Sequence, residues 1–259
     1  MQLKFFMKEL REEYPAVLSV LKTATTVREA SDAVLLKFER PADQSEAARA
    51  KRAAYGQAYY NTLTGKETTM FTNSPLVSYT RISPNKTPNR NHAIDTVTIH
   101  CIVGQWTAKQ GCDYFATTNR QCSANYVVGK DGSIGLSVEE KDRSWCSSSA
   151  SNDNRAITIE VASDTTHPYK VTDAAYQSLI ALLADICKRN GIKELKWKAD
   201  KSLIGKVEQQ NMTVHRWFAP KACPGDYLYN LHGQIAAEVN KRLGVSGSTT
   251  PAATPPKAT

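Results

Sequence analysis

Apolar residues recur at helical spacing through the first quarter of the chain. A first group of apolar residues lies between Phe5 and Leu21. A second group begins after Thr26, includes Val27, Ala30, Val34 and Leu35, and ends at Phe38, before Pro41. A third amphipathic stretch runs from about Ser45, its expected N-cap, to Tyr60. We therefore predict a small all-helical segment over residues 1–64. The first group consists of Phe5, Phe6, Leu10, Val17, Leu18 and Leu21.

The pattern changes after residue 64. Residues 65–90 are rich in Thr, Ser, Asn and Pro, which predicts a linker leading into a second domain over residues 91–244. In that domain short β-prone runs alternate with longer amphipathic ones, so we expect an α/β fold with a mixed central β-sheet flanked by helices. The expected strands are 95–101, 126–129, 133–137, 156–162 and 212–215, and the expected helices 113–118, 172–190 and 226–243.

Two polar stretches interrupt or follow this pattern. Residues 144–154 form a serine-rich run containing Trp145, which suits a loop along a groove. Residues 245–259 consist mainly of Ser, Thr, Pro and Ala, a composition that predicts a disordered tail.

Composition narrows the class of protein. The chain has 33 basic and 25 acidic side chains, a formal charge of +8, which favours an anionic partner such as a cell-wall polymer or simply aids solubility. Its basic residues are scattered, and we find no nucleic-acid-binding motif. No run of 18 apolar residues predicts a membrane span. Because the N-terminus is charged where a signal peptide would be apolar, we expect export by another route.

The six cysteines do not decide the cellular compartment. None forms a CxxC pair, and Cys187 lies on the apolar side of a predicted helix, as a core thiol would. Cys112 and Cys122 flank one short segment and could pair under oxidising conditions, although spacing cannot establish connectivity.

The strongest candidate for chemistry is the segment 211–226. His215 ends a short predicted strand, and Cys223 follows eight positions later, held in a tight turn by Pro224 and Gly225. An imidazole and a thiolate that converge in this way suit tetrahedral zinc, and Lys221 would place a cation beside the metal.

A zinc site needs a third protein ligand, for which His100 is the best candidate. It lies at the end of the predicted strand 95–101. A single histidine at a strand end is usually a hydrogen-bonded core imidazole. Two such histidines together with Cys-Pro-Gly favour a metal site.

Four ordered blocks between about residues 80 and 244 resemble the type 2 family of zinc-dependent N-acetylmuramoyl-L-alanine amidases, which includes phage amidase lysozymes and peptidoglycan recognition proteins. Together the blocks make the resemblance specific, whereas one alone would be weak. They are Val97–His100, Ser123–Gly132, Asn154–Glu160 and His215–Gly225.

The resemblance implies roles for individual residues. His100, His215 and Cys223 would hold Zn²⁺, Glu160 would be the general base, and Lys221 would stabilise the oxyanion. Trp145, Asn125 and Arg216 would line the groove for the glycan and peptide.

The chain departs from the family pattern at three positions. Asn125 and Cys146 stand where many or some members have histidine, and Ala124 stands where one branch has an active-site tyrosine. Because Ala124 cannot take the role of that tyrosine, we expect Glu160 to supply the catalytic acid–base group. Recognition-only members often lose the third ligand, so retention of Cys223 indicates an active enzyme.

The N-terminal segment resembles a second family. Ala30–Tyr60 is similar to the C-terminal part of a phage tail-tip lysozyme domain. The part that would carry a muramidase's catalytic acid is absent from this match, so we expect no glycosidase activity, and Glu39 reads as an exposed carboxylate.

These observations predict a zinc amidase that cleaves the bond between N-acetylmuramic acid and L-alanine in peptidoglycan. The setting would be a phage or prophage lysin, or a related bacterial autolysin, acting at the cell wall or outside the cell. Two alternatives remain: a peptidoglycan-binding module without catalysis, and a cysteine peptidase that uses Cys223.

Overall fold

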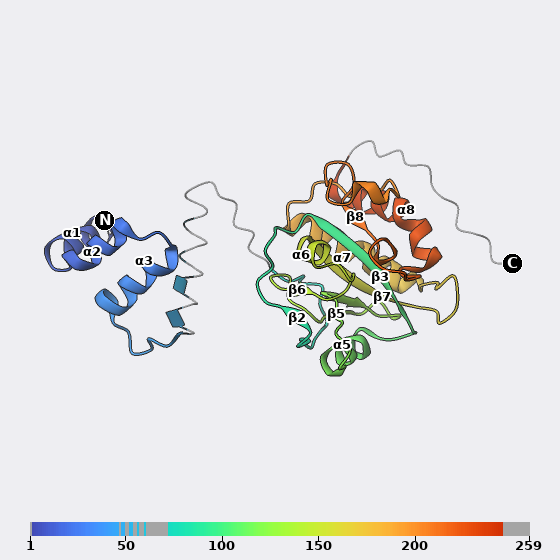
Figure 1. Cartoon of the computed structure of the whole chain (residues 1–259), viewed down its shortest axis with the longest axis horizontal. Helices are drawn as coiled ribbons and strands as arrows, with labels where there is room; N and C mark the ends of the chain where they lie inside the picture. Colours follow the sequence, from blue (N-terminus) through green and yellow to red (C-terminus); the bar gives the residue numbers. More distant parts are fainter. Residues whose placement is uncertain are drawn as a thin grey trace. The chain divides into compact units, whose positions relative to one another are not determined.

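A computed structural model describes residues 2–46, 48–49, 52–53, 56, 60 and 72–245. The chain divides into two compact units, Met1–Met70 and Phe71–Thr259 (Figure 1). Among the described residues, every helix is too short or too polar to cross a bilayer.

The first unit is helical, as predicted. It contains α1 (Gln2–Glu12), α2 (Pro15–Thr23) and α3 (Val27–Val34), and α3 continues into a π-helical turn, η1 (Leu35–Glu39). Thr26 caps α3 by accepting a hydrogen bond from the Glu29 N–H. The Phe38 ring packs edge-on against Phe6 and Tyr14. Half of the third predicted helix, 45–60, lies outside the described residues, as does the tail from residue 246.

The second unit is built on a mixed six-stranded sheet, which confirms the predicted fold class. The strand order is β1-β5-β4-β7-β3-β8, and β4 with β5 is the antiparallel pair among otherwise parallel neighbours. A separate antiparallel pair joins β2 to β6. The strands are β1 (Tyr79–Thr80), β2 (Lys86–Thr87), β3 (Thr96–Val103), β4 (Tyr126–Val128), β5 (Ile134–Leu136), β6 (Arg143–Ser144), β7 (Ala156–Ser163) and β8 (Met212–Thr213).

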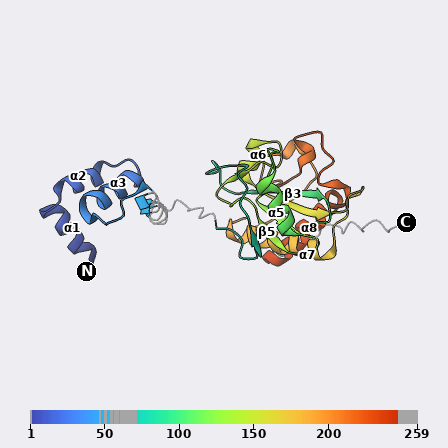
Figure 2. The same ribbon diagram turned by 90° about the horizontal axis from the view of Figure 1, so that it is seen from below.

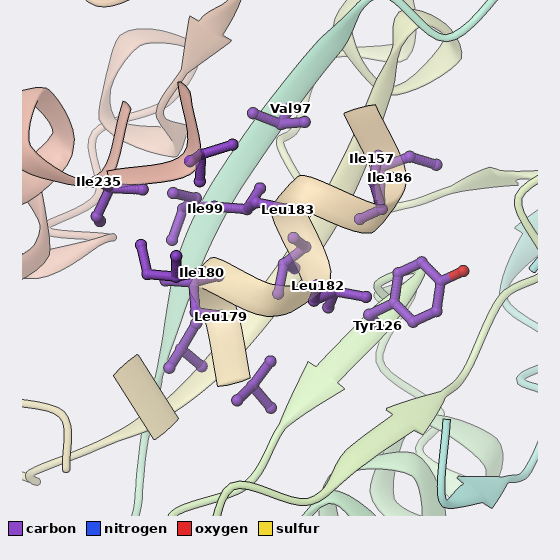
Figure 3. Packing of buried hydrophobic residues seen from close by; sticks show 14 of the residues in the cluster. Val97, Ile99, Tyr126, Ile157, Leu179, Ile180, Leu182, Leu183, Ile186 and Ile235 are labelled. Atoms are coloured by element: carbon purple, nitrogen blue, oxygen red, sulfur yellow. The ribbon is translucent and has the colours of Figure 1, made fainter. Parts of the chain in front are cut away.

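The main core lies between the sheet and two helices, α7 (Asp173–Arg189) and α8 (Gly225–Leu243). Side chains alternate along a strand, so one set of β3 and β7 residues faces these helices. Figure 3 shows Ile99 of this set beside Leu183 of α7, and Ile157 beside Ile186 of the same helix. The other set faces the opposite side, where α5 (Ala108–Thr117) and α6 (Ala150–Arg155) lie (Figure 2). The candidate chemistry lies on this second face.

Three elements differ from the sequence prediction. The helix expected over 113–118 begins at Ala108, because Thr107 and Gln110 form a capping box. Residues 79–80 and 86–87, placed in a linker, pair with β5 and β6. The loop 144–154 contains the short helix α6, capped by Ser149.

Candidate active site

Three side chains that could hold a metal ion meet beside the middle of β3, where His100 lies, and not at a strand end as the sequence suggested. The donor atoms of His100, His215 and Cys223 all lie within 4.8 Å of one another. The Nδ1 atom of His100 is 3.3 Å from the Cys223 sulfur, and the two imidazole ring centroids are 5.1 Å apart. The segments that supply these residues are far apart in sequence, and the fold brings them together.

Each ligand is placed by a different local structure. His100 is buried within β3. His215 opens the 3-10 turn η3 (His215–Trp217) directly after β8. Cys223 ends the loop before α8, and its carbonyl accepts the Arg216 N–H at 3.1 Å, which closes that loop on itself.

Gly225 allows the ligand loop to pack closely. Its φ of 79° lies in the left-handed region, and a Cβ at this position would come within 2.9 Å of the Tyr169 side chain. The glycine of the Pro-Gly pair is therefore required sterically at this position of the folded protein.

The environment keeps both histidines neutral. Burial, followed by the neighbouring His215 and His232, holds the pKa of His100 well below its usual value. Burial also lowers the pKa of His215; the charge of Asp153 opposes this effect, and the smaller influence of Lys221 adds to it. Neutral imidazoles are the form that binds a metal ion.

Glu160 lies beside the three ligands. In the parallel pairing of β3 with β7 it is the direct partner of His100, so both side chains project from the same face. Burial raises the pKa of Glu160 to about 7. The Cys146 thiol donates a hydrogen bond to Oε1 at 3.8 Å, whereas the buried Oε2 has no hydrogen-bond partner among the described residues. A carboxylate with these properties can exchange a proton near neutral pH.

Lys221 is exposed on the loop between His215 and Cys223. Its backbone N–H bonds the Ala219 carbonyl at 2.8 Å. Its charge is the smallest of the three influences on the pKa of His215, after burial and the opposing charge of Asp153. Lys221 is therefore an exposed cation on the loop that carries His215 and Cys223.

The structure corrects the assignment of Asn125 to substrate binding. Asn125 is fully buried, and its side chain is hydrogen-bonded within the protein. Its Oδ1 atom accepts the Thr158 N–H at 3.1 Å, and its Nδ2 atom donates to the Val138 carbonyl at 3.2 Å. Asn125 thus joins the chain before β4 to β7 and cannot reach a ligand.

The other two groove residues have partial internal roles. The Arg216 guanidinium bonds Asp226 at 3.0 Å and lies 4.7 Å from the centre of the Tyr229 ring. These contacts direct it toward α8. The indole N–H of Trp145 donates to Thr87 at 2.9 Å, and the side chain remains partly exposed next to Cys146.

The cysteines are all free thiols, including Cys112 and Cys122, which we considered as a possible pair. Cys187 is a buried core residue of α7, as predicted. The sequence reasoning missed the contact of Cys146 with Glu160. The one feature of the sequence that could have drawn attention to Cys146 is its position directly after the loop tryptophan, Trp145.

Two imidazoles, a thiol and an adjacent carboxylate on one face of an α/β sheet are typical of a metal-dependent hydrolase. The chain belongs to the N-acetylmuramoyl-L-alanine amidase family, whose profile matches residues 90–226. The profile of the phage tail lysozyme family matches residues 1–63. A comparison with curated proteins found no match.

Several solved structures are similar to this chain at low identity. PlyL is 15% identical with a TM-score of 0.46, over 63% of this chain and 94% of its own. A mutant endolysin from Bacillus subtilis is 16% identical with a TM-score of 0.47, over 63% and 99%. A selenomethionine derivative of AmpD is 20% identical with a TM-score of 0.47, over 66% and 95%.

Proposed function

We propose that this chain is a zinc-dependent amidase that hydrolyses the bond between N-acetylmuramic acid and L-alanine in peptidoglycan. The observation that carries the proposal is the convergence of His100, His215 and Cys223 beside the carboxylate of Glu160. Family membership supports an amidase acting on peptidoglycan.

The donor set fits zinc. Two neutral imidazoles and one thiol match the ligand types of catalytic zinc sites, which keep a fourth position open. The Oε2 atom of Glu160 supports the same proposal, because a buried carboxylate oxygen normally has a hydrogen-bond partner and this one has none among the described residues. When bound, zinc polarises the amide carbonyl and lowers the pKa of a water molecule to ~7.

Glu160 would act as the general base and then as the general acid. Its raised pKa of about 7 lets it accept a proton from water and return it to the leaving amine of alanine. The Cys146 thiol, bonded to Oε1, would orient the carboxylate and leave Oε2 free for the proton.

Lys221 would stabilise the negative charge that develops on the carbonyl oxygen. An exposed ammonium group on the ligand loop can approach a bound substrate without displacing a metal ligand. Removing one donor of this kind typically costs about 3 kcal/mol of transition-state stabilisation.

The cysteine-peptidase alternative fits the site poorly. A nucleophilic cysteine needs a lowered pKa. Here a hydrogen bond with Cys101, and then burial, raise the pKa of Cys223 well above its usual value. The thiol would ionise in response to a metal ion and would otherwise remain inert.

The setting follows from the same resemblances. We propose that the protein acts on the bacterial cell wall, outside the cytoplasm, as a lysin of phage or prophage origin. Both profiles point in this direction. The basic surface, with a formal charge of +8, suits a polyanionic wall.

The decisive experiment measures new N-terminal alanine released from purified cell walls by the native chain, by Glu160→Ala and by Glu208→Ala, a control at an exposed carboxylate. Zinc content is measured on all three. We expect about one zinc in each, with alanine released by the native chain and the control. Zinc without alanine release in the native chain would favour the binding module. Activity that survives complete removal of metal by a chelator would contradict the zinc mechanism.

A further inference from the structure

The loop between β6 and α6 reaches both histidines of the candidate site. The Ser147 hydroxyl oxygen lies 3.4 Å from Nε2 of His100, and the Ser148 hydroxyl oxygen lies 3.0 Å from Nε2 of His215. Two consecutive side chains of one loop thus contact two rings, one from β3 and one from the 3-10 turn η3.

These contacts give the two nitrogens of each ring different surroundings. Nδ1 of His100 faces the Cys223 sulfur at 3.3 Å, while its Nε2 faces Ser147. In His215 the contact with Ser148 occupies Nε2 and leaves Nδ1 for the donor set. With a metal ion on Nδ1, the hydrogen of each neutral ring is on Nε2, where a serine oxygen can accept it.

The loop is anchored from within the protein. The Asp153 carboxylate accepts the backbone N–H groups of Cys146 at 3.0 Å and of Ser147 at 3.1 Å. Asp153 is buried in α6, so the two amides are held against a fixed acceptor. The anchor leaves little freedom for the serine that follows.

A second anchor ties Ser147 to the strands that lead to the histidines. The amide nitrogen of Asn152 donates to Ser147 Oγ at 3.1 Å and to Thr98 Oγ1 at 3.0 Å. Its Oδ1 accepts the Thr213 hydroxyl at 2.9 Å. Thr98 lies two residues before His100, and Thr213 two residues before His215. One side chain therefore sets the loop relative to both strands.

The backbone conformation of Ser148 indicates that its surroundings hold it in place. Its φ of 59° is left-handed, a conformation that a residue with a Cβ adopts at a cost. Ser148 is exposed, so burial of its side chain does not explain this conformation. The turn is the one that brings its hydroxyl to His215.

We propose that Ser147 and Ser148 are positioning residues for the metal centre, which accept hydrogen bonds from Nε2 of His100 and His215 and so present Nδ1 of both rings to the metal. This inference rests on the proposed zinc site. It assigns the serine-rich loop a role in metal affinity, in addition to any role as a groove wall.

The test measures zinc affinity by competition with a chromophoric chelator. The variants are Ser147→Ala, Ser148→Ala and the double variant, with Ser151→Ala as the control, because Ser151 bonds only Ser149 among the contacts of its side chain in the described structure. We expect the double variant to bind zinc about 10- to 100-fold more weakly than the native chain. Ser148→Ala alone should lose part of this affinity. Because the Ser148 side chain is exposed, its truncation should leave folding intact, so a loss of affinity in this variant would reflect the contact with His215.

Nitrogen NMR of the imidazoles in the zinc-loaded native protein reports which ring nitrogen binds the metal and which carries the hydrogen. A purely structural role of the serines would not determine this result. We expect metal on Nδ1 and hydrogen on Nε2 in both rings. Metal on Nε2 of His215, or a double variant that binds zinc as tightly as Ser151→Ala, would overturn the inference while leaving the zinc site intact. A native chain that binds no zinc would overturn the zinc site and the inference together.

Discussion

The thiol of Cys146 lies 3.8 Å from Oε1 of Glu160 and is the hydrogen-bond donor that the described structure provides for this carboxylate. Burial raises the pKa of Glu160, and this hydrogen bond opposes the rise. The balance between the two sets the pH at which the carboxylate can act as a base.

Cys146→Ala should therefore make the enzyme less active at neutral pH. Without the donor, the pKa of Glu160 rises further, and the acidic limb of the pH–rate profile moves to higher pH. A weak hydrogen bond to a charged group contributes about 1 kcal/mol, so its loss raises the pKa by about 0.7. Because the pKa of Glu160 starts at about 7, the ionised fraction at pH 7, and with it kcat, should fall roughly threefold. Cys146→Ser retains a donor and should keep most of the native profile. An unshifted profile in Cys146→Ala would show that the thiol does not act on Glu160.

Lys221→Ala should reduce kcat/KM without loss of zinc. If the ammonium group stabilises the oxyanion, its removal should cost about 10²- to 10³-fold. Zinc content should stay unchanged, because Lys221 is exposed and outside the donor set. Lys206→Ala is the matched control on another exposed loop lysine. Equal activity of both variants would remove Lys221 from the mechanism.

His232 should make the protein sensitive to mild acid. Burial lowers its pKa to about 4, whereas an unfolded histidine has a pKa of about 6.5. The unfolded chain therefore takes up the proton first as the pH falls. The contribution of the neutral ring to stability is complete above about pH 6.5 and is lost between there and about pH 4, roughly 3 kcal/mol in all.

Urea unfolding in the presence of a chelator measures this effect. The native chain should lose more stability between pH 7 and pH 4.5 than His232→Phe, even if the variant is less stable at both. His100 contributes in the same direction in both proteins, so the difference isolates His232. Parallel pH dependences would contradict the prediction.

Arg189→Met should destabilise the second unit by about 3 kcal/mol, because it leaves the charge of Glu140 buried without its partner. Glu140 is fully buried, and the Arg189 guanidinium bonds both of its oxygens, at 2.6 and 3.0 Å. Tyr126 and Asn190 complete the contacts of the carboxylate.

Thermal unfolding of three variants tests this pair. Arg242→Met is the control, because within the described part of the chain the Arg242 guanidinium makes one long hydrogen bond, 3.4 Å, to Gln177. The double variant Glu140→Met/Arg189→Met should be more stable than Arg189→Met, since the fully buried charge at position 140 is removed and only the partly exposed Asp185 loses its contact with Arg189. A double variant as unstable as the single one would show that the loss comes from packing.

The sequence predicts the elements that carry the candidate ligands because their signals are local. The β-prone run before His100 and the Cys-Pro-Gly turn are both short patterns with a direct backbone meaning. The capping box of Thr107 and Gln110 was equally local, and it could have placed the start of α5 at Ala108.

The remaining features depend on contacts that no local pattern contains. Asn125 sits beside a strand and looks available to a ligand, yet its amide bonds β7, a segment 33 residues away. The two-residue strands β1 and β2 are too short to show alternation. In the serine-rich loop, spacing does not reveal that Ser147 and Ser148, rather than their neighbours, meet the two histidines.

The direct pairing of His100 with Glu160 on adjacent parallel strands also affects how such an enzyme can diversify. The distance between the proposed metal ligand His100 and the proposed base Glu160 is an interstrand spacing, which the hydrogen-bond ladder between β3 and β7 maintains. Loop exchange at the rim of the site would therefore leave this distance unchanged. An engineer could graft new walls onto the groove and keep the reacting groups in place, provided that the two serines and their anchors are carried over with the loop.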